Sequence, residues 1–278
     1  MHRSARGAAA ALAGALLLVL AVAAPRAAAD EVDIIVLKEH GVGSATLAQP
    51  YLERFMALAA QQNGWAAAKG QYLTNRAAGV SFIKAHAPHY GILSLGAFLA
   101  LRGPYHLEVV GRVASALVGG EQYFVVSKTA QDLAGCNGRT LASDHADDVR
   151  FVERVVARGA FKLGEFKLVP NQRPLQSIKQ LLGGEVECAL IDDAQLAELQ
   201  HLQGGADVRV VWKSAKLPQM VVVAFPSAPA GERKTFQANL RHVCDGDDGE
   251  AACAEVGIRA LDAAGAADYA DVVSAYGG

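Results

Sequence analysis

The chain has 278 residues and a formal net charge of −2, because 26 Lys and Arg residues stand against 28 Asp and Glu residues. This near-neutral balance, with no basic stripe along the sequence, argues against nucleic acid as a partner. Apolar residues make up 52% of the chain, which is enough for the core of one large α/β unit or of two smaller lobes.

The N-terminal segment has the pattern of a secretory signal peptide. Basic residues at positions 2, 3 and 6 precede an apolar run over residues 8–24, and three alanines at 27–29 supply small residues before Asp30. We therefore expect residues 1–29 to be a signal peptide, cleaved near Ala29, and the mature protein to be exported. A single membrane anchor is the alternative, but such anchors usually need about 20 apolar residues.

Beyond residue 30, short apolar runs alternate with amphipathic segments, a pattern that predicts strands alternating with helices. Strands are expected at 32–37, 70–73, 90–94, 106–113, 122–127, 139–143, 166–169, 187–192, 208–212 and 220–226. Helices are expected over Thr46–Ala59, Val80–Lys84 and Phe98–Leu101, on Val149, Val152, Val155 and Val156, from Pro174 to Gly183, and around Phe236, Leu240 and Ile258.

This alternation indicates an α/β protein with parallel sheets covered by helices. Gly119-Gly120 and Leu217-Pro218 interrupt the pattern and mark two places where the chain crosses between lobes. We expect a discontinuous first lobe formed by residues 30–119 and 218–278, and a second lobe formed by residues 120–217. Two lobes joined by two hinge strands can close around a ligand in the cleft between them.

The four cysteines fit an oxidising compartment. Cys244 and Cys253 flank an acidic loop and can form a local disulfide. Cys136 and Cys188 each stand next to an apolar run, and neighbouring parallel strands would bring them together as a second disulfide. A zinc site is the alternative, but the sequence has no C-x-x-C motif and no His/Cys pairing.

In open parallel sheets, ligands bind beyond the carboxyl ends of the strands. This rule selects loop residues after the expected strands, together with two residues at the first crossing. The candidate ligand-binding residues are His40, Ser44, Ser94, Glu121, Tyr123, Ser143, Asp144, Asn171 and Asp192. For Asp192 an equally ordinary role is to cap the helix that begins at Ala194, and Tyr123 could simply pack in the hinge.

The stretch "LASDHADDVRF" at residues 141–151 combines three carboxylates with a histidine. Ser143 or Asp144 suits the N-cap of a helix, and Asp147 and Asp148 suit its first turn, where negative charge is favoured. A metal site would need ligands that converge from elsewhere, and no second cluster is apparent. No nucleophile–base motif and no phosphate-binding glycine pattern is present, so we expect neither an enzyme nor a metal or other cofactor.

Three segments carry a resemblance to a known family: "EQYFVVSKTAQDLAGCNGRTLAS" (121–143), "PLQSIKQLLGGEVECALIDDAQL" (174–196) and "KSAKLPQMVVVA" (213–224). They resemble the hinge strands and second lobe of type 2 periplasmic solute-binding proteins, in particular the phosphonate-type binding proteins of ABC importers. The resemblance implies a two-lobed α/β fold, a periplasmic monomer, a small-molecule ligand in the cleft and an inner-membrane transporter as partner.

The ligand is harder to infer, because phosphonate binders of this family place small hydroxyl residues and glycine where this chain has Asp144, Asp147 and Asp148. An oxyanion would be repelled by these carboxylates, and the neighbouring cleft positions offer no arginine. We therefore expect a neutral or lipid-like solute, for example a sterol, since some relatives of phosphonate binders resemble carriers of hydrophobic molecules. Glu121 and Tyr123 would anchor its hydroxyl.

Three alternatives remain open from the sequence. The protein could be a phosphonate- or phosphate-type importer component, as the main resemblance suggests. It could also be a ligand-sensing module for a membrane receptor, or an enzyme of the same fold. A clustered His, Cys or Lys chemistry in the cleft would favour the enzyme, whereas the cleft loops carry only His40 and His145.

Overall fold

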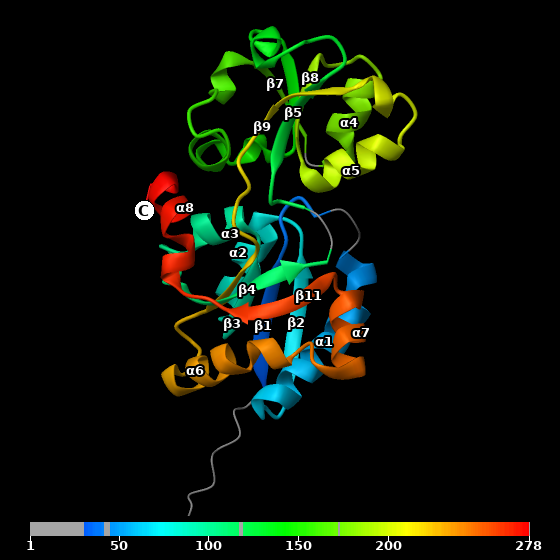
Figure 1. Cartoon of the computed structure of the whole chain (residues 1–278). Coiled ribbons are helices and arrows are strands. Elements are labelled where there is room, and N and C mark those ends of the chain that lie inside the picture. The colour runs from blue at the N-terminus through cyan, green and yellow to red at the C-terminus, as the bar shows by residue number, and fades with distance from the viewer. Residues whose placement is uncertain (1–30, 42–44, 117–118, 172, 278) are drawn as a thin grey trace, which may run out of the picture.

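The computed structural model describes residues 31–41, 45–116, 119–171 and 173–277, and its described part forms two lobes, each built on one sheet (Figure 1). The predicted signal peptide and the candidate Ser44 lie outside these residues. Two-lobed α/β architecture, as expected from the sequence, is confirmed. We call the half with the six-stranded sheet the first lobe and the half with the five-stranded sheet the second lobe.

The sheet of the first lobe has the strand order β11-β4-β10-β3-β1-β2. Its strands are β1 (Val32–Leu37), β2 (Ala68–Leu73), β3 (Tyr90–Leu93), β4 (Glu108–Ser115), β10 (Val221–Ala224) and β11 (Ile258–Ala263). The helices of this lobe are α1 (Ala45–Asn63), α2 (Arg76–His86), α3 (Leu95–Leu101), α6 (Ala230–Asn239) and α7 (Gly246–Glu255), followed by α8 (Ala270–Tyr276) at the C-terminal end.

The sheet of the second lobe has the order β7-β6-β8-β5-β9. It contains β5 (Tyr123–Ser127), β6 (Thr140–Ser143), β7 (Lys167–Pro170), β8 (Cys188–Asp192) and β9 (Arg209–Lys213), with helices α4 (Pro174–Leu182) and α5 (Asp193–His201). Short helical turns complete both lobes: η1 (Leu133–Cys136), η2 (His145–Asp147), the π-helical η3 (Phe151–Val156), η4 (Leu163–Glu165), η5 (Gly205–Asp207), η6 (Leu240–His242) and η7 (Ala266–Tyr269).

The expectation of parallel sheets holds only for part of each sheet, because both sheets are mixed. β1 pairs in parallel with β2 and β3, whereas β10 runs antiparallel to β3 and β4. In the second lobe β5 is likewise antiparallel to β8 and β9. β10 and β5 are the strands by which the chain enters a sheet from the other lobe. Such a strand has no βαβ crossover to force it into the parallel direction.

Two residues of the expected helices differ from the prediction. Val149 is helical, as expected, but its side chain is 49% exposed, so it does not share the buried face of Val152, Val155 and Val156 in the π-helical η3 that follows. Ile258 begins strand β11 instead of a helix, and this strand forms the edge of the six-stranded sheet beside β4. A short apolar run fits either element by periodicity, so its pairing with β4 decided the outcome.

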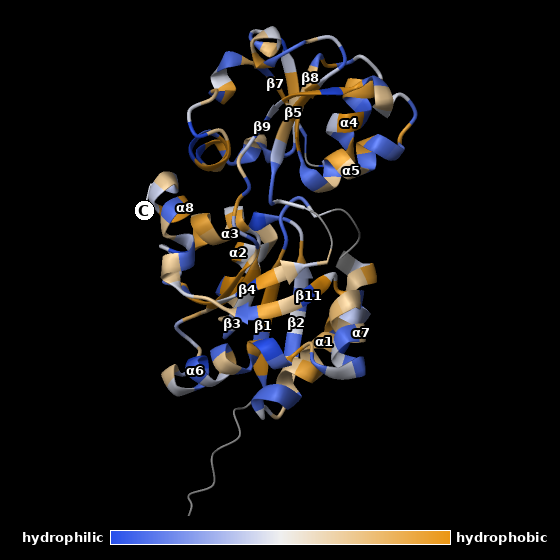
Figure 2. Cartoon of the chain, viewed as in Figure 1, coloured by the Kyte–Doolittle hydropathy of each residue, from blue (hydrophilic) through white to orange (hydrophobic). Residues whose placement is uncertain are grey.

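The apolar core follows the strands of both sheets, which carry much of the hydrophobic colour in Figure 2. One buried cluster extends across both lobes: it joins Leu93 and Phe98 of the first lobe to Tyr123 and Phe151 of the second. The lobes are therefore held together by apolar packing as well as by the connecting strands.

Helix α8 lies at the boundary between the lobes rather than within the first lobe alone (Figure 1). The Tyr276 hydroxyl donates to Asp148 Oδ2 at 3.3 Å, and Asp271 pairs with Arg158 at 2.6 Å. The Arg150 guanidinium lies 5.2 Å from the centre of the Tyr276 ring. The chain thus links the lobes a third time, through its C-terminal helix.

Both expected disulfides are confirmed. Cys136 and Cys188 are bonded with their Cα atoms 6.2 Å apart, and Cys244 and Cys253 with their Cα atoms 5.7 Å apart. The first bond ties η1 to strand β8, beside the strand β6 that leads into the cleft. No free cysteine occurs among the described residues.

Candidate functional site

The first lobe contributes the loop that follows β1. Gly41 N–H donates to the Lys38 carbonyl at 3.2 Å, which closes a turn at residues 38–41. His40 adopts a left-handed backbone with φ of 58°, a conformation that is uncommon for a non-glycine residue. This turn directs the His40 ring toward the second lobe, where it stacks edge-on against His145 with ring centres 4.5 Å apart.

The second lobe contributes the residues after β6. The Ser143 hydroxyl donates to the Leu190 carbonyl at 2.9 Å and accepts from His145 N–H at 3.1 Å, so it shapes the turn. Asp144 Oδ1 accepts from the Gln195 side chain at 2.9 Å. The Ser143 hydroxyl already makes these two hydrogen bonds within the second lobe, and Ser143 does not line the cavity. The structure therefore does not support its expected ligand-binding role.

His40 and Asp144 meet across the cleft. His40 Nδ1 lies 3.5 Å from Asp144 Oδ2, and His40 Nε2 lies 3.6 Å from Asp147 Oδ1. Burial acts to lower the pKa of His40, but the two carboxylates outweigh burial and raise it. Burial likewise acts to raise the pKa of Asp144, but the two imidazoles and an amide hydrogen bond lower it to about 2.

An arginine crosses the cleft beside this group, contrary to expectation. Arg76, at the start of α2, donates to both carboxylate oxygens of Glu39 at 2.6 and 2.8 Å and to Asp148 Oδ2 at 2.7 Å. Burial opposes the charged guanidinium, yet these bonds outweigh burial and raise the pKa of Arg76. Since Arg76 is in the first lobe and Asp148 in the second, the network joins the lobes.

The three carboxylates of residues 144–148 therefore have different roles. Asp148 Oδ1 accepts from Phe151 N–H at 2.9 Å and caps η3, as expected for a carboxylate at a helix start. Asp144 and Asp148 both make interlobe contacts, and Asp147 reaches His40. Capping explains only one of the three carboxylates.

The crossing strands supply the next part of the cleft wall. Asp192 caps α5 by accepting from Gln195 N–H at 2.9 Å, and its other oxygen accepts from Gly120 N–H at 3.1 Å. Burial raises the pKa of Asp192. Glu121 accepts from the Gln219 side chain at 3.0 Å, which links the two crossing segments.

Tyr123 is only 5% exposed and packs edge-on against His145 and Phe151, with ring centres 5.0 and 5.8 Å away. Burial raises the pKa of its phenol well above the usual value. Tyr123 borders the cavity, but it does not lie with Glu121 on one face of a strand, because β5 begins only at Tyr123. Its burial also fits the alternative of packing in the hinge, and its role toward a ligand stays a prediction.

A cavity of about 320 Å³ lies between the lobes and brings these residues together. Of the residues expected from the sequence, those that line it are His40, Ser94, Glu121, Tyr123 and Asp192. Asp144 lies buried behind His40. Asn171 does not line the cavity, and its side-chain amide donates to Ser177 Oγ of α4 at 2.8 Å.

Four charged lining residues were missed by the sequence analysis: Lys38, Glu39, Arg76 and Glu198. His145, Asp147 and Asp148, which the sequence placed near the cleft without naming them as ligand-binding residues, also line the cavity. Lys38 follows β1 directly, so the rule on strand ends could have found it. Arg76 starts a helix after β2 and has no local signal that points to the cleft.

The charges of the cavity wall are unequal. Its described lining includes six carboxylates but only two permanent cations, Lys38 and Arg76. Arg76 is already paired with Glu39 and Asp148. Lys38 has no ion pair with any carboxylate in the described part of the chain. The Glu39 carboxylate itself lies at the start of α3, 3.4 Å from where a Cβ atom on Gly96 would be.

Residues 21–269 match the family described as ABC transporter, phosphonate, periplasmic substrate-binding protein. The chain belongs to this family. The expected resemblance is thereby confirmed, and the general role follows: a periplasmic substrate-binding protein delivers a small molecule to a membrane transporter and is not an enzyme. Cleavage of the signal peptide near Ala29 and the monomeric state stay predictions.

Several solved structures share the fold. A binding protein component of an ABC phosphonate transporter from Pseudomonas aeruginosa is 13% identical, with a TM-score of 0.65, over 87% of this chain and 84% of that chain. PhnD1 of Prochlorococcus marinus in complex with methylphosphonate is 9% identical, with a TM-score of 0.64, over 88% and 96%. A Xanthomonas citri protein bound to ATP is 10% identical, with a TM-score of 0.69, over 88% and 95%.

At these identities the structures show the fold alone. No curated protein matches the sequence. Among the helices of the described residues, none has the length and apolar character needed to cross a membrane.

Proposed function

We propose that this protein is the solute-binding component of a phosphonate-type ABC importer, and that its ligand is a small zwitterionic phosphonate bound in the cavity between the lobes. One observation carries the choice of a zwitterion: a single cavity offers the unpaired ammonium of Lys38 and, around it, a surplus of carboxylates. The ammonium of Lys38 can bind the phosphonate group of the ligand, and the carboxylates can bind its amino group.

The positions of these charges support such a pose. Lys38 belongs to the loop after β1, next to the crossing segment at Gly119 and Gly120. Asp147 and Glu198 lie on the second lobe and border the same cavity. A charge-assisted hydrogen bond is worth about 1.5–3 kcal/mol, so an aminoalkylphosphonate can gain at both ends. A simple phosphonate would gain at Lys38 only and would be repelled by the surplus of carboxylates.

The expectation of a lipid-like ligand has little support in this cavity. A sterol would cover the six carboxylates of the wall with hydrocarbon. Only Glu39 and Asp148 among them are paired with Arg76, and desolvating the other charges is costly. The volume of about 320 Å³ is also at the low end of the range for small-molecule pockets. Family membership favours the phosphonate alternative as well.

The boundaries of the lobes are part of the proposal. We place the hinge segments at 119–120 and 217–218, with residues 30–119 and 218–278 assigned to the first lobe. The sheet memberships of β4, β5, β9 and β10 support these positions, while helix α8 also contacts the second lobe.

Calorimetry on the mature protein in EDTA tests the ligand. We expect 2-aminoethylphosphonate to bind more tightly than methylphosphonate, and Lys38→Met to weaken its binding at least about tenfold, which corresponds to about 1.4 kcal/mol. Lys69→Met is the matched control, because Lys69 is exposed on β2 and pairs with Glu31 at 2.6 Å. Binding of a fluorescent sterol with no heat from either phosphonate would restore the lipid hypothesis.

A further inference from the structure

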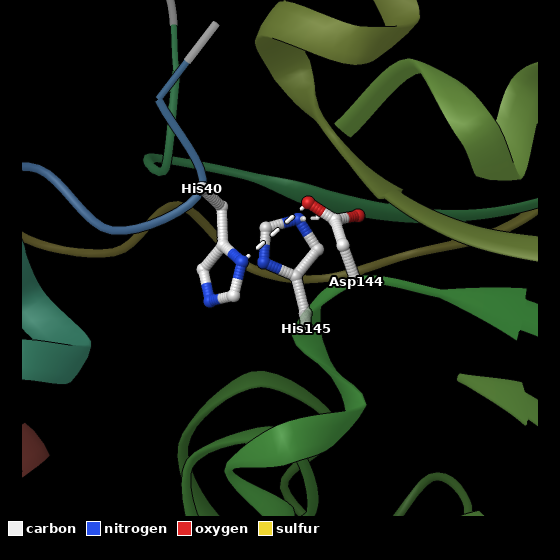
Figure 3. A group of neighbouring side chains, drawn as sticks. All are labelled: His40, Asp144 and His145. Atoms are coloured by element: carbon white, nitrogen blue, oxygen red, sulfur yellow. Dashed lines mark ion pairs between the residues drawn. The ribbon is translucent and has the colours of Figure 1, made fainter. Parts of the chain in front are cut away.

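Three potential metal ligands converge between the lobes. His40 comes from the loop after β1, and Asp144 and His145 come from the turn after β6. One donor atom of each lies within 4.8 Å of the other two. Figure 3 shows the two imidazole rings and the carboxylate directed toward one another.

Hydrogen bonds to the Gln195 side chain fix the orientation of His145 and Asp144 and leave His145 Nδ1 free to bind a metal ion. Gln195 Oε1 accepts from Asp192 N–H at 2.9 Å, so the same oxygen must accept from His145 Nε2, 3.0 Å away. His145 then carries its proton on Nε2 and has a free lone pair on Nδ1. The Gln195 amide donates to Asp144 Oδ1, so one side chain orients both residues.

Asp144 presents its second oxygen to this space without a hydrogen bond. Its side chain is fully buried, and Oδ2 has no hydrogen-bond partner among the described residues. Its nearest cationic neighbour is His40 Nδ1 at 3.5 Å. A buried carboxylate oxygen without a hydrogen bond is costly, and a cation bound between these atoms would remove that cost.

The spacing fits a metal ion better than a hydrogen bond. His40 Nδ1 and Asp144 Oδ2 are 3.5 Å apart, beyond the usual hydrogen-bond range. Two ligands at about 2.0–2.1 Å from a tetrahedral zinc ion stand roughly 3.3–3.4 Å apart. On the far side of the ring, Asp147 Oδ1 lies 3.6 Å from His40 Nε2, too far for a hydrogen bond but near enough for its negative charge to favour a proton on Nε2, which leaves Nδ1 for the metal ion.

We propose that His40, Asp144 and His145 form a binding site for a divalent transition metal ion of the zinc type, held between the two lobes. Two imidazoles and one carboxylate are ligands that suit zinc. His40 and His145 border the cavity, so the fourth position of the ion faces water or a bound solute. One ligand belongs to the first lobe and two to the second, and the ion therefore favours the closed arrangement of the lobes.

The site does not depend on the proposed ligand. A zinc titration of ligand-free protein reports on the metal alone, whereas the phosphonate titration in EDTA reports on the solute alone. Failure of either one leaves the other standing.

Mature protein without an affinity tag, stripped with EDTA and exchanged into buffer, is titrated with ZnCl₂ by calorimetry. We expect one equivalent to bind, and His40→Gln and Asp144→Asn to weaken binding at least about tenfold, because loss even of a residue that only orients a metal ligand typically costs about 10–100-fold in affinity. Cobalt(II) should give the intense visible absorption of a tetrahedral site. His242→Gln is the matched control, because His242 pairs with Asp245 at 2.7 Å but on the exposed surface and outside the three-residue group.

Circular dichroism melts establish that each variant is folded. If Asp144→Asn fails to fold, His40→Gln decides, since the His40 side chain is partly exposed. Zinc affinity that is unchanged in His40→Gln, or no zinc binding by the wild-type protein at micromolar concentrations, would overturn the proposal. In that case the group contains only an ion pair between a protonated His40 and Asp144, with His145 packed beside it.

Discussion

Replacing Arg76 by methionine should destabilise the protein more than any exposed arginine would. Arg76 donates three hydrogen bonds to Glu39 and Asp148, whose side chains are only 6% and 8% exposed. Removing one partner of a buried ion pair leaves the other charge uncompensated and costs about 3–5 kcal/mol. The Arg76 side chain is 29% exposed, so we expect a loss near 3 kcal/mol.

The same reasoning predicts that stability is recovered when the unpaired carboxylates of Glu39 and Asp148 are also neutralised. In the triple variant Arg76→Met, Glu39→Gln, Asp148→Asn no buried charge of this network remains unpaired, and the new amide oxygen at position 148 can still accept from Phe151 N–H. Neutral replacement of a buried ion network is often close to neutral in stability, so most of the loss should return.

Urea unfolding of EDTA-treated protein at pH 7, followed by circular dichroism, measures both variants. Arg54→Met is the matched control: Arg54 also has two acidic partners, Glu255 at 2.9 Å and Asp248 at 3.7 Å, but this group is exposed. It should cost no more than about 1 kcal/mol. An Arg76→Met variant as stable as Arg54→Met, or a triple variant no more stable than the single one, would refute the reasoning.

Three further predictions concern the disulfides, the hinge and a helix cap. Serine at Cys136 and Cys188 should cost about 4 kcal/mol in the chain-entropy model, and serine at Cys244 and Cys253 about 3 kcal/mol, because the first loop is longer; urea midpoints that rank the pairs in reverse would contradict this. Saturation with 2-aminoethylphosphonate should reduce the radius of gyration in small-angle scattering, and an unchanged profile would argue against hinged closure. Asp192→Asn should unfold within about 0.5 kcal/mol of wild type, whereas Asp192→Ala should lose about 1–2 kcal/mol of unfolding free energy, since asparagine retains the cap; equal losses would remove the capping role.

The alternation of strands and helices, interrupted at Gly119-Gly120 and Leu217-Pro218, was enough to predict two α/β lobes, and the positions of the four cysteines were enough to predict both disulfides. Strand direction was not predictable in the same way: the apolar run of β10 is buried whether it pairs in parallel or antiparallel. The direction of β10 depends on the fact that the chain enters this sheet from the other lobe. Local periodicity of apolar residues does not report such a long-range arrangement.

The candidate site was predicted in part, for a related reason. Residues that follow strands, such as His40 and Ser94, could be placed at the cleft from the geometry of parallel sheets. Arg76 reaches Asp148 over a separation of 72 residues, and no spacing rule links them. A metal site was dismissed because residues 144–148 had no second cluster nearby, yet the fold brings His40 to Asp144 from the other lobe.

The placement of α8 has a consequence for how the two lobes separate. Any opening of the cleft must first release the Tyr276–Asp148 hydrogen bond and the Arg158–Asp271 ion pair, both far along the chain from the crossing strands. These contacts are individually weak, each worth on the order of 1 kcal/mol. We expect their loss to raise the fraction of open molecules although neither contact involves the proposed ligand, so that substitutions in α8 would change the apparent affinity for the ligand.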